Sequence, residues 1–244
     1  MSEPEPQKAG SPVLGSRFLK EVAAAGEETF TADGAIHKTG ILTLILVAGA
    51  ILTWSQPGFG VALLPLLLVA FVLAMIITFN PASSPFLAPL YALLEGMVLG
   101  ALSSMYEVLY HGIVFQAAAG TMGILGFMVV GYASGFLKLG ARMKAVVIAS
   151  TMGLALCYLF SIVAGMFGYH VGFIHDSGPW GIGFSVFALI IAALNFSLDF
   201  EFIEVSAQQG LSKRMEWYAG FGVLVTLVWV YLEMLRLLGK LRKK

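Results

Sequence analysis

The strongest constraint on this chain is a series of apolar stretches that are each close to the length needed to cross a lipid bilayer. A hydrocarbon core about 30 Å thick is spanned by about 20 residues of α-helix. Seven stretches meet or approach that length, at residues 39–54, 59–79, 85–105, 113–135, 145–167, 180–199 and 218–238. The pattern predicts an all-α polytopic membrane protein whose seven-transmembrane-helix bundle occupies residues 39–238.

Composition supports this class and argues against others. Charged residues make up 11% of the chain and apolar residues 59%, whereas a soluble domain usually carries about 25% charged residues. The 14 basic and 14 acidic residues cancel, so no net field favours nucleic acid as a partner. One cysteine, Cys157, excludes an internal disulfide. The lipid bilayer is therefore the expected main partner.

Polar segments flank the apolar region at both ends. We expect residues 1–38 to form a partly flexible N-terminal arm, with a short surface helix at 18–30 as an alternative, and residues 239–244 to form a short basic tail. The arm lacks the early apolar core of a secretory signal, which predicts that it is retained.

Lysine and arginine gather on one side of the predicted spans. With the N-terminus inside, the inner segments carry the basic residues and the three short outer loops carry none, which predicts a cytoplasmic N-terminus. The same rule disfavours an outside position for the basic tail. Whether the last stretch crosses fully or re-enters therefore stays open, although its length favours a complete crossing.

Small residues at helical spacing indicate close helix packing. Gly96 and Gly100, and again Gly131 and Gly135, have the GxxxG spacing that places two bare backbone patches on one helix face. Such spacing also arises by chance in a chain with 28 glycines.

Three acidic residues lie inside predicted spans, where an ionised side chain costs about 2.5 to 3.5 kcal/mol on insertion scales. These are Glu95, Asp199 and Glu233. Each also has a purely structural interpretation. Glu233 could pair with Arg236 three residues later, Asp199 could belong to an interfacial acidic cluster, and Glu95 could be protonated and hydrogen-bonded to a neighbouring helix.

Other polar residues carry weaker predictions. Acidic residues at helix ends and in loops are expected to be solvated: Glu107, Glu201, Glu204 and Glu216. His170, His175 and Asp176 share one loop and favour solvation over a metal site. Nucleophile, zinc-protease and phosphate-loop signatures are absent from the sequence, so we expect no enzyme and no tightly bound cofactor.

Four runs, KTGILT, APLYALLEGMVLGALSSMYE, SGPWGIGFSVFALIIAALNFSLDFEFIE and MEWYAGFGVLVTLVWVYLEMLRLL, cover much of the chain after the arm. In these runs the sequence resembles the bacterial Bax inhibitor-1-like branch of the transmembrane Bax inhibitor motif family. The resemblance implies a seven-helix fold with the last helix central. It also implies a pH-sensitive calcium leak.

The resemblance assigns roles to particular positions. The paired acids of the family, which share a proton and act as pH sensor and gate, match Asp199 and Glu233. A latching arginine of some relatives would fall near Asn80, where this chain has no basic residue. Glu95 is an additional buried acid that the resemblance does not explain. Asn80, Asn195 and Arg236 are expected to be supporting polar residues.

Together these observations predict a calcium leak channel or transporter of the cell inner membrane. Two neighbouring carboxylates in a poorly solvated interior titrate as a unit, so Asp199 and Glu233 are expected to share a hydrogen bond and to bind Ca²⁺ weakly and transiently. Helix six must continue to about residue 208, or helix seven begin late, for the two to meet. The alternative is a non-transporting protein that binds and regulates other membrane proteins, such as a membrane protease.

Overall fold

A computed structural model describes residues 28–54, 60–169, 172 and 176–243. Within these residues the chain forms seven long α-helices and one short 3-10 turn. The helices are α2 (Ala32–Trp54), α3 (Gly60–Phe79), α4 (Ser84–Leu109), α5 (Ile113–Ala133), α6 (Ala141–Met166), α8 (Pro179–Gln208) and α9 (Met215–Arg242), and the turn is η1 (Pro81–Ser83).

Six of the described helices are long and apolar enough to cross a membrane, and α3 adds the shorter apolar segment Leu63–Phe79. Many large apolar side chains on these helices are exposed on the outside of the bundle, as a lipid-facing surface requires. The predicted all-α polytopic membrane fold is therefore confirmed.

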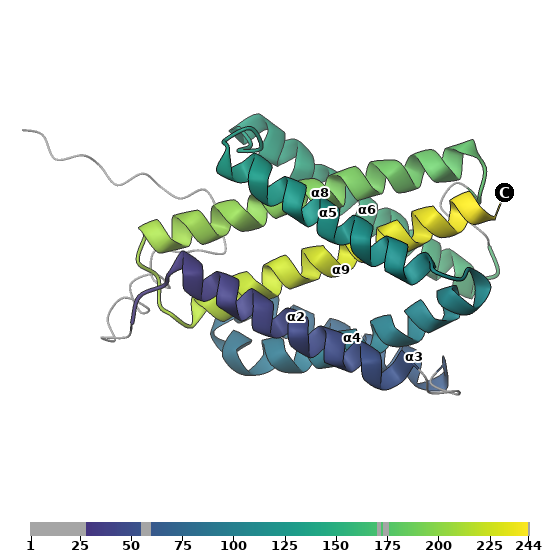
Figure 1. Ribbon diagram of the computed structural model, residues 1–244, viewed down its shortest axis with the longest axis horizontal. Coiled ribbons are helices and arrows are strands. Elements are labelled where there is room, and N and C mark those ends of the chain that lie inside the picture. The colour runs from purple at the N-terminus through teal and green to yellow at the C-terminus, as the bar shows by residue number, and fades with distance from the viewer. Residues whose placement is uncertain (1–27, 55–59, 170–171, 173–175, 244) are drawn as a thin grey trace, which may run out of the picture.

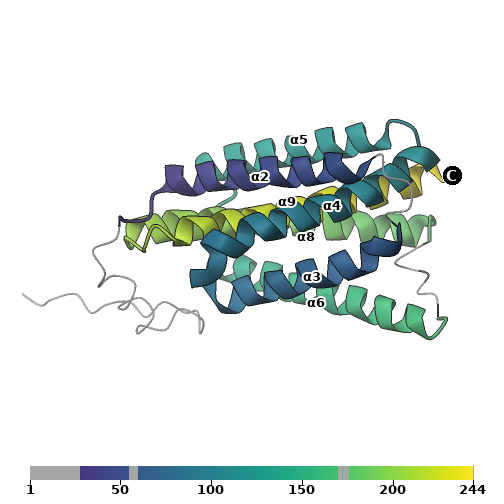
Figure 2. The ribbon, with the colours of Figure 1, turned by 90° about the horizontal axis from the view of Figure 1, so that it is seen from below.

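The last helix, α9, lies at the centre of the bundle (Figure 1). It packs against α2, α4, α5 and α8. Viewed from the side, α2 and α5 form one layer, α4, α9 and α8 the middle layer, and α3 and α6 the third (Figure 2). The outer helices α3 and α6 are held by α4 and α8 respectively. The prediction that the last helix is central is confirmed.

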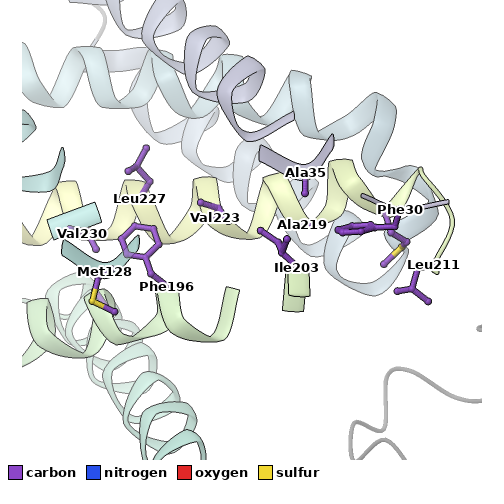
Figure 3. Packing of buried hydrophobic residues seen from close by; sticks show 12 residues of the cluster. Phe30, Ala35, Met128, Phe196, Ile203, Leu211, Ala219, Val223, Leu227 and Val230 are labelled. Atoms are coloured by element: carbon purple, nitrogen blue, oxygen red, sulfur yellow. The ribbon is translucent and has the colours of Figure 1, made fainter. Parts of the chain in front are cut away.

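Buried apolar side chains follow α9 along most of its length. Figure 3 shows this core, from Phe30 and Leu211 near the start of α9 to Met128 and Val230 further along it. Within lipid, such packing stabilises a bundle mainly through van der Waals contact, because lipid chains are as apolar as the side chains. Phe30 precedes α2 and is only 3% exposed, so the end of the N-terminal arm belongs to the core.

Of the two GxxxG pairs, one makes the predicted helix contact. A Cβ atom at Gly96 would lie 2.0 Å from the carbonyl oxygen of Leu46, and one at Gly100 would lie 2.1 Å from that of Ala50. The backbones of α2 and α4 therefore approach closely at these glycines. For the second pair the prediction is wrong, because Gly131 faces Leu137 of the following turn and Gly135 adopts a left-handed conformation with φ of 83°.

Several helix boundaries depart from the prediction, and three of these departures bear on the site. The first helix begins at Ala32 rather than Thr39, so it takes in the end of the predicted arm. The sixth continues to Gln208, one of the two possibilities foreseen. The seventh runs unbroken to Arg242 and so includes most of the predicted basic tail. Its 28 residues span about 42 Å, which is long enough for a complete crossing.

The segment before α2, residues 28–31, is hydrogen-bonded to the connection between α8 and α9. The backbone nitrogen of Phe30 donates to the carbonyl of Leu211 at 2.7 Å, and that of Lys213 donates to Glu28 at 2.9 Å. The Glu28 and Lys213 side chains also form an ion pair, which lowers the pKa of Glu28 and raises that of Lys213. The rest of the predicted arm, including most of the possible 18–30 helix, lies outside the described residues.

Glu216 is fully buried, contrary to the prediction that it is solvated. It is 1% exposed and accepts hydrogen bonds from the backbone nitrogen and the hydroxyl of Thr31, at 3.0 and 2.9 Å. Thr31 immediately precedes α2, and its own hydroxyl accepts from the backbone nitrogen of Gly34. Glu216 on α9 thereby caps the start of α2 across the helix interface.

Candidate functional site

Asp199 lies within the membrane-spanning part of α8 and points at the central helix. It is nine residues before the end of α8, about 13 Å of helix. Its Oδ2 accepts a hydrogen bond from the Thr226 hydroxyl of α9 at 2.6 Å. Gly222, one turn earlier on α9, also faces the carboxylate, since a Cβ atom there would lie 3.4 Å from Oδ1, in ordinary van der Waals contact. A single neutral hydroxyl is thus the hydrogen-bond partner of Asp199 within the described residues.

Glu233 lies deeper along α9 and has a different environment. It is 1% exposed, and its Oε1 accepts from the Tyr158 hydroxyl of α6 at 2.6 Å and from Arg236 at 2.8 Å. The Trp229 indole nitrogen adds a third donor at 3.2 Å. Oε2 is buried and accepts no hydrogen bond from the described residues. Glu233 is therefore half of a buried ion pair, as the structural interpretation of the sequence predicted.

Arg236 joins this cluster to α6. Its guanidinium donates to the Tyr158 hydroxyl at 2.8 Å and lies 4.7 Å from the centre of the same ring. Planar stacking and a fixed fork of donors suit arginine to this double contact. Glu233, Arg236 and Tyr158 therefore link α9 to α6 in the interior of the bundle.

The predicted hydrogen bond between Asp199 and Glu233 is absent. Asp199 bonds to Thr226, whereas Glu233 lies seven residues further along α9, about 10 Å of helix. One Ca²⁺ ion bound at 2.3 to 2.6 Å from each ligand cannot bridge carboxylates at such different levels. The proton-sharing pair and the joint weak calcium site are therefore corrected to two separate carboxylates. Because α8 extends to Gln208, Asp199 lies further from the end of its helix than predicted. It still lies at a different level along α9 from Glu233.

Glu95 has no hydrogen bond or ion pair with any other described residue. It is partly buried on α4, one turn after Tyr91, whose ring packs edge-on against Phe221 of α9 with centroids 5.1 Å apart. Glu95 is eleven residues into α4, as Thr226 is into α9. Because both helices start at the same end of the bundle, Glu95 lies at a depth close to that of Asp199 (Figure 1).

The two predicted supporting asparagines lie elsewhere. Asn195 donates to the Thr151 hydroxyl at 2.9 Å and to the carbonyl of Ile191 at 2.8 Å, so it ties α8 to α6. Asn80 is exposed beside η1, where its backbone carbonyl accepts from Ser83 and its side chain forms no cap. Neither forms a hydrogen bond with Asp199 or Glu233.

Four residues of the site were not singled out from the sequence. Thr226, Trp229 and Tyr158 supply donors to the two acids. Lys240 is 5% exposed, and its amine donates to the Gly181 carbonyl and the Ser185 hydroxyl of α8 at 2.7 and 2.8 Å. The sequence predicts that Lys240 belongs to the short basic tail. Its spacing of four residues from Arg236, which puts both on one helix face, indicates instead that α9 continues through it.

The remaining acids are satisfied near helix ends. Glu107 accepts from the backbone nitrogens of Gly112 and Val114 and so caps α5. Glu201 pairs with Lys144, and Glu204 pairs with Lys138 at 2.9 Å. The predicted acidic cluster therefore does not include Asp199, which faces α9. No group of three metal-binding side chains occurs among the described residues, and the loop with His170 and His175 lies outside them.

Comparison with known proteins agrees with the fold. The profile of the family described as Bax inhibitor 1 like matches residues 11–243, nearly the whole chain. No individually curated protein matches the chain. A match of this extent, together with the seven-helix bundle and its central last helix, confirms the resemblance noted in the sequence: the chain belongs to the Bax inhibitor 1-like family of membrane proteins.

Proposed function

We propose that this protein is a pH-sensitive cation leak pathway through a bacterial inner membrane, with calcium as the permeant ion. The end at which α2 begins faces the cytoplasm in this proposal, because the basic connections before α6 and α9 lie at that same end (Figure 1). The observation that supports a conducting role is Asp199, a carboxylate within a membrane-spanning helix whose partner is one neutral hydroxyl.

Asp199 is proposed as the proton-sensitive group. The Thr226 to Asp199 distance of 2.6 Å falls within the range of about 2.5 to 2.7 Å for a hydroxyl bound to a carboxylate. Such charge-assisted bonds are roughly twice as strong as neutral ones. Protonation of Asp199 therefore weakens its contact with α9, and we expect the leak to rise as the pH falls.

Glu233 is proposed to hold the helices in place. Arg236 compensates its charge, and Tyr158 and Trp229 add hydrogen bonds, so it offers little net attraction to a passing cation. Glu95 is the proposed second acid of the pathway, since it lies at a depth close to that of Asp199 and has no basic partner among the described residues.

A weak calcium site is better suited to a leak than to calcium storage. Calcium takes six to eight oxygen ligands, and Asp199 and Thr226 supply only carboxylate and hydroxyl oxygens from two side chains. Water and backbone carbonyls must complete the shell. The ion is then held loosely enough to leave again.

Flux through reconstituted vesicles tests the proposal. Full-length protein is placed in liposomes loaded with a calcium dye, and the leak is measured between about pH 5 and pH 8. We expect Asp199→Asn to leak at the acid-state rate at every pH. The matched control Glu201→Gln removes a carboxylate paired with Lys144 near the end of the same helix, and it should retain the pH dependence. Flux that keeps its pH dependence in Asp199→Asn would refute the role of Asp199.

The alternative is regulation of another membrane protein without transport. Protein that gives no calcium flux at any pH, yet forms a stoichiometric crosslink to a membrane partner that survives Asp199→Asn, would favour it.

A further inference from the structure

A second polar feature lies at the end of the bundle where α2, α4 and α9 begin. It is a pocket of about 420 Å³ lined in part by Lys38, Lys213, Arg214, Phe86 and Trp217. These residues come from the first two turns of α2, from the first turns of α4 and α9, and from the residues just before α9. The pocket is separate from Asp199 and Glu233, so an inference from it does not rest on the proposed leak.

Basic side chains dominate the pocket. Among the described residues its lining holds three cations and one carboxylate, Glu28, which pairs with Lys213. The nearby Glu216 carboxylate bonds to Thr31 instead. Lys38 lies 4.8 Å from the centre of the Trp217 ring, which holds its amine at the pocket wall. The net charge of the lining is positive and favours an anionic ligand.

The rest of the pocket wall is largely apolar and includes an exposed aromatic ring. Phe86 is 83% exposed at the start of α4, and Pro85 and Ala82 line the same side. Tryptophan beside basic side chains is typical of the boundary between headgroups and acyl chains. A small soluble anion would contact only the basic side chains. A phospholipid would contact the basic side chains through its headgroup and the aromatic wall through an acyl chain.

We propose that this pocket binds an anionic phospholipid, with the headgroup phosphate against Lys38 and Arg214 and an acyl chain over Phe86. Basic pockets between membrane helices bind acidic lipid headgroups in this way. The lipid bridges the starts of α2, α4 and α9, beside the hydrogen bonds between residues 28–31 and the α8–α9 connection.

Native mass spectrometry of the full-length protein in detergent tests the site. Phosphatidylglycerol and phosphatidylcholine with identical acyl chains are titrated separately. We expect selective retention of phosphatidylglycerol, and roughly twenty-fold weaker binding of it in Lys38→Gln/Arg214→Gln, since each basic residue near an anionic lipid contributes about a five-fold factor. The matched control Arg142→Gln/Lys144→Gln removes two cations at the start of α6, and it should bind as the wild type does.

Further variants and competing ligands distinguish the ligand classes and control for misfolding. Lys38→Arg/Arg214→Lys keeps both charges and should retain binding, while Phe86→Gln should weaken phosphatidylglycerol binding through the acyl chain alone. Inorganic phosphate and glycerol phosphate should not displace the lipid. Equal retention of the two lipids by the wild type, an equal loss in the control variant, or displacement by inorganic phosphate would overturn the proposal.

Discussion

Asp199 and Glu233 are both acidic residues within membrane-spanning helices, and they differ in what compensates their charge. Glu233 has a cation, a phenol and an indole around one carboxylate oxygen. Asp199 has one threonine hydroxyl. A charge buried in low dielectric is tolerable only with such partners, and the number of partners decides whether the charge serves structure or exchange. Glu233 is therefore placed in helix packing, and the lone hydroxyl partner of Asp199 is what supports its proposed role in proton and ion exchange.

The largest predicted effect comes from removing the cation beside Glu233. Arg236→Met leaves a buried carboxylate without its counterion, and we expect a loss of about 2 to 4 kcal/mol in the free energy of unfolding. The estimate is below the full value for a buried pair because the Arg236 side chain is 30% exposed. Denaturation in detergent measures it.

A double variant is the control for this effect. In Glu233→Met/Arg236→Met neither charge remains, so much of the lost stability should return. If Arg236→Met unfolds as the wild type does, the ion pair does not stabilise the bundle and the contrast with Asp199 fails.

A smaller loss is expected when Asp199 loses its donor. Thr226→Val removes the hydroxyl at nearly constant volume, and we expect a loss of about 1 to 2 kcal/mol, because the carboxyl group escapes part of the cost by taking up a proton. Thr226→Ser keeps the hydroxyl and should remain within about 0.5 kcal/mol of the wild type. Equal losses in both variants would show that packing, and not the hydrogen bond, is responsible.

The separation of the two acids predicts that their substitutions are independent. In a double-mutant cycle, Asp199→Asn and Glu233→Gln should show a coupling energy below about 0.5 kcal/mol in unfolding, as sites without a shared hydrogen-bond partner normally do. A proton-sharing pair would instead show strong coupling. A coupling energy well above 1 kcal/mol would restore the direct pair.

The exposed pair of Glu28 and Lys213 should give the smallest effect and sets the lower end of the comparison. Hydrogen bonding and attraction to Lys213 hold the pKa of Glu28 below its ordinary value of 4.5. The pair therefore stabilises the folded protein fully above the ordinary pKa of 4.5. This stabilisation is lost as the pH falls through the lowered pKa of Glu28. Wild type and Glu28→Gln should differ slightly at neutral pH and converge in acid, as measured by thermal unfolding. A difference that grows in acid would contradict this assignment.

The fold was predictable because apolar length alone defines the spans. Each predicted span overlaps a described helix, and the last apolar run forms a single unbroken helix long enough to cross a bilayer. The boundaries shifted where polar residues continue a helix, as at Gln208 and Arg242, because hydrophobicity does not mark the end of a helix that is buried by neighbours. Lys240 is the clearest case, since its charge suggested solvent while its packing places it against α8.

The acids of the candidate site were predictable and their partners were not. Asp199 and Glu233 stood out because charge is rare inside apolar runs. Their pairing depended on depth, and depth follows from where α8 ends and α9 begins. The donors Thr226 and Tyr158 are ordinary residues of membrane helices, and only the packing of α8 and α6 on α9 brings them to the carboxylates.

Direct titration of the buried carboxyl groups tests the division of roles. Infrared difference spectra of the full-length protein in lipid, recorded during acidification, report carbonyl bands of newly protonated carboxyl groups. We predict a band that is lost in Asp199→Asn and retained in Glu233→Gln. Carbonyl bands in Asp199→Asn that are identical to those of the wild type, or loss in Glu233→Gln of the same band that Asp199→Asn removes, would contradict the assignment of the exchangeable proton to Asp199.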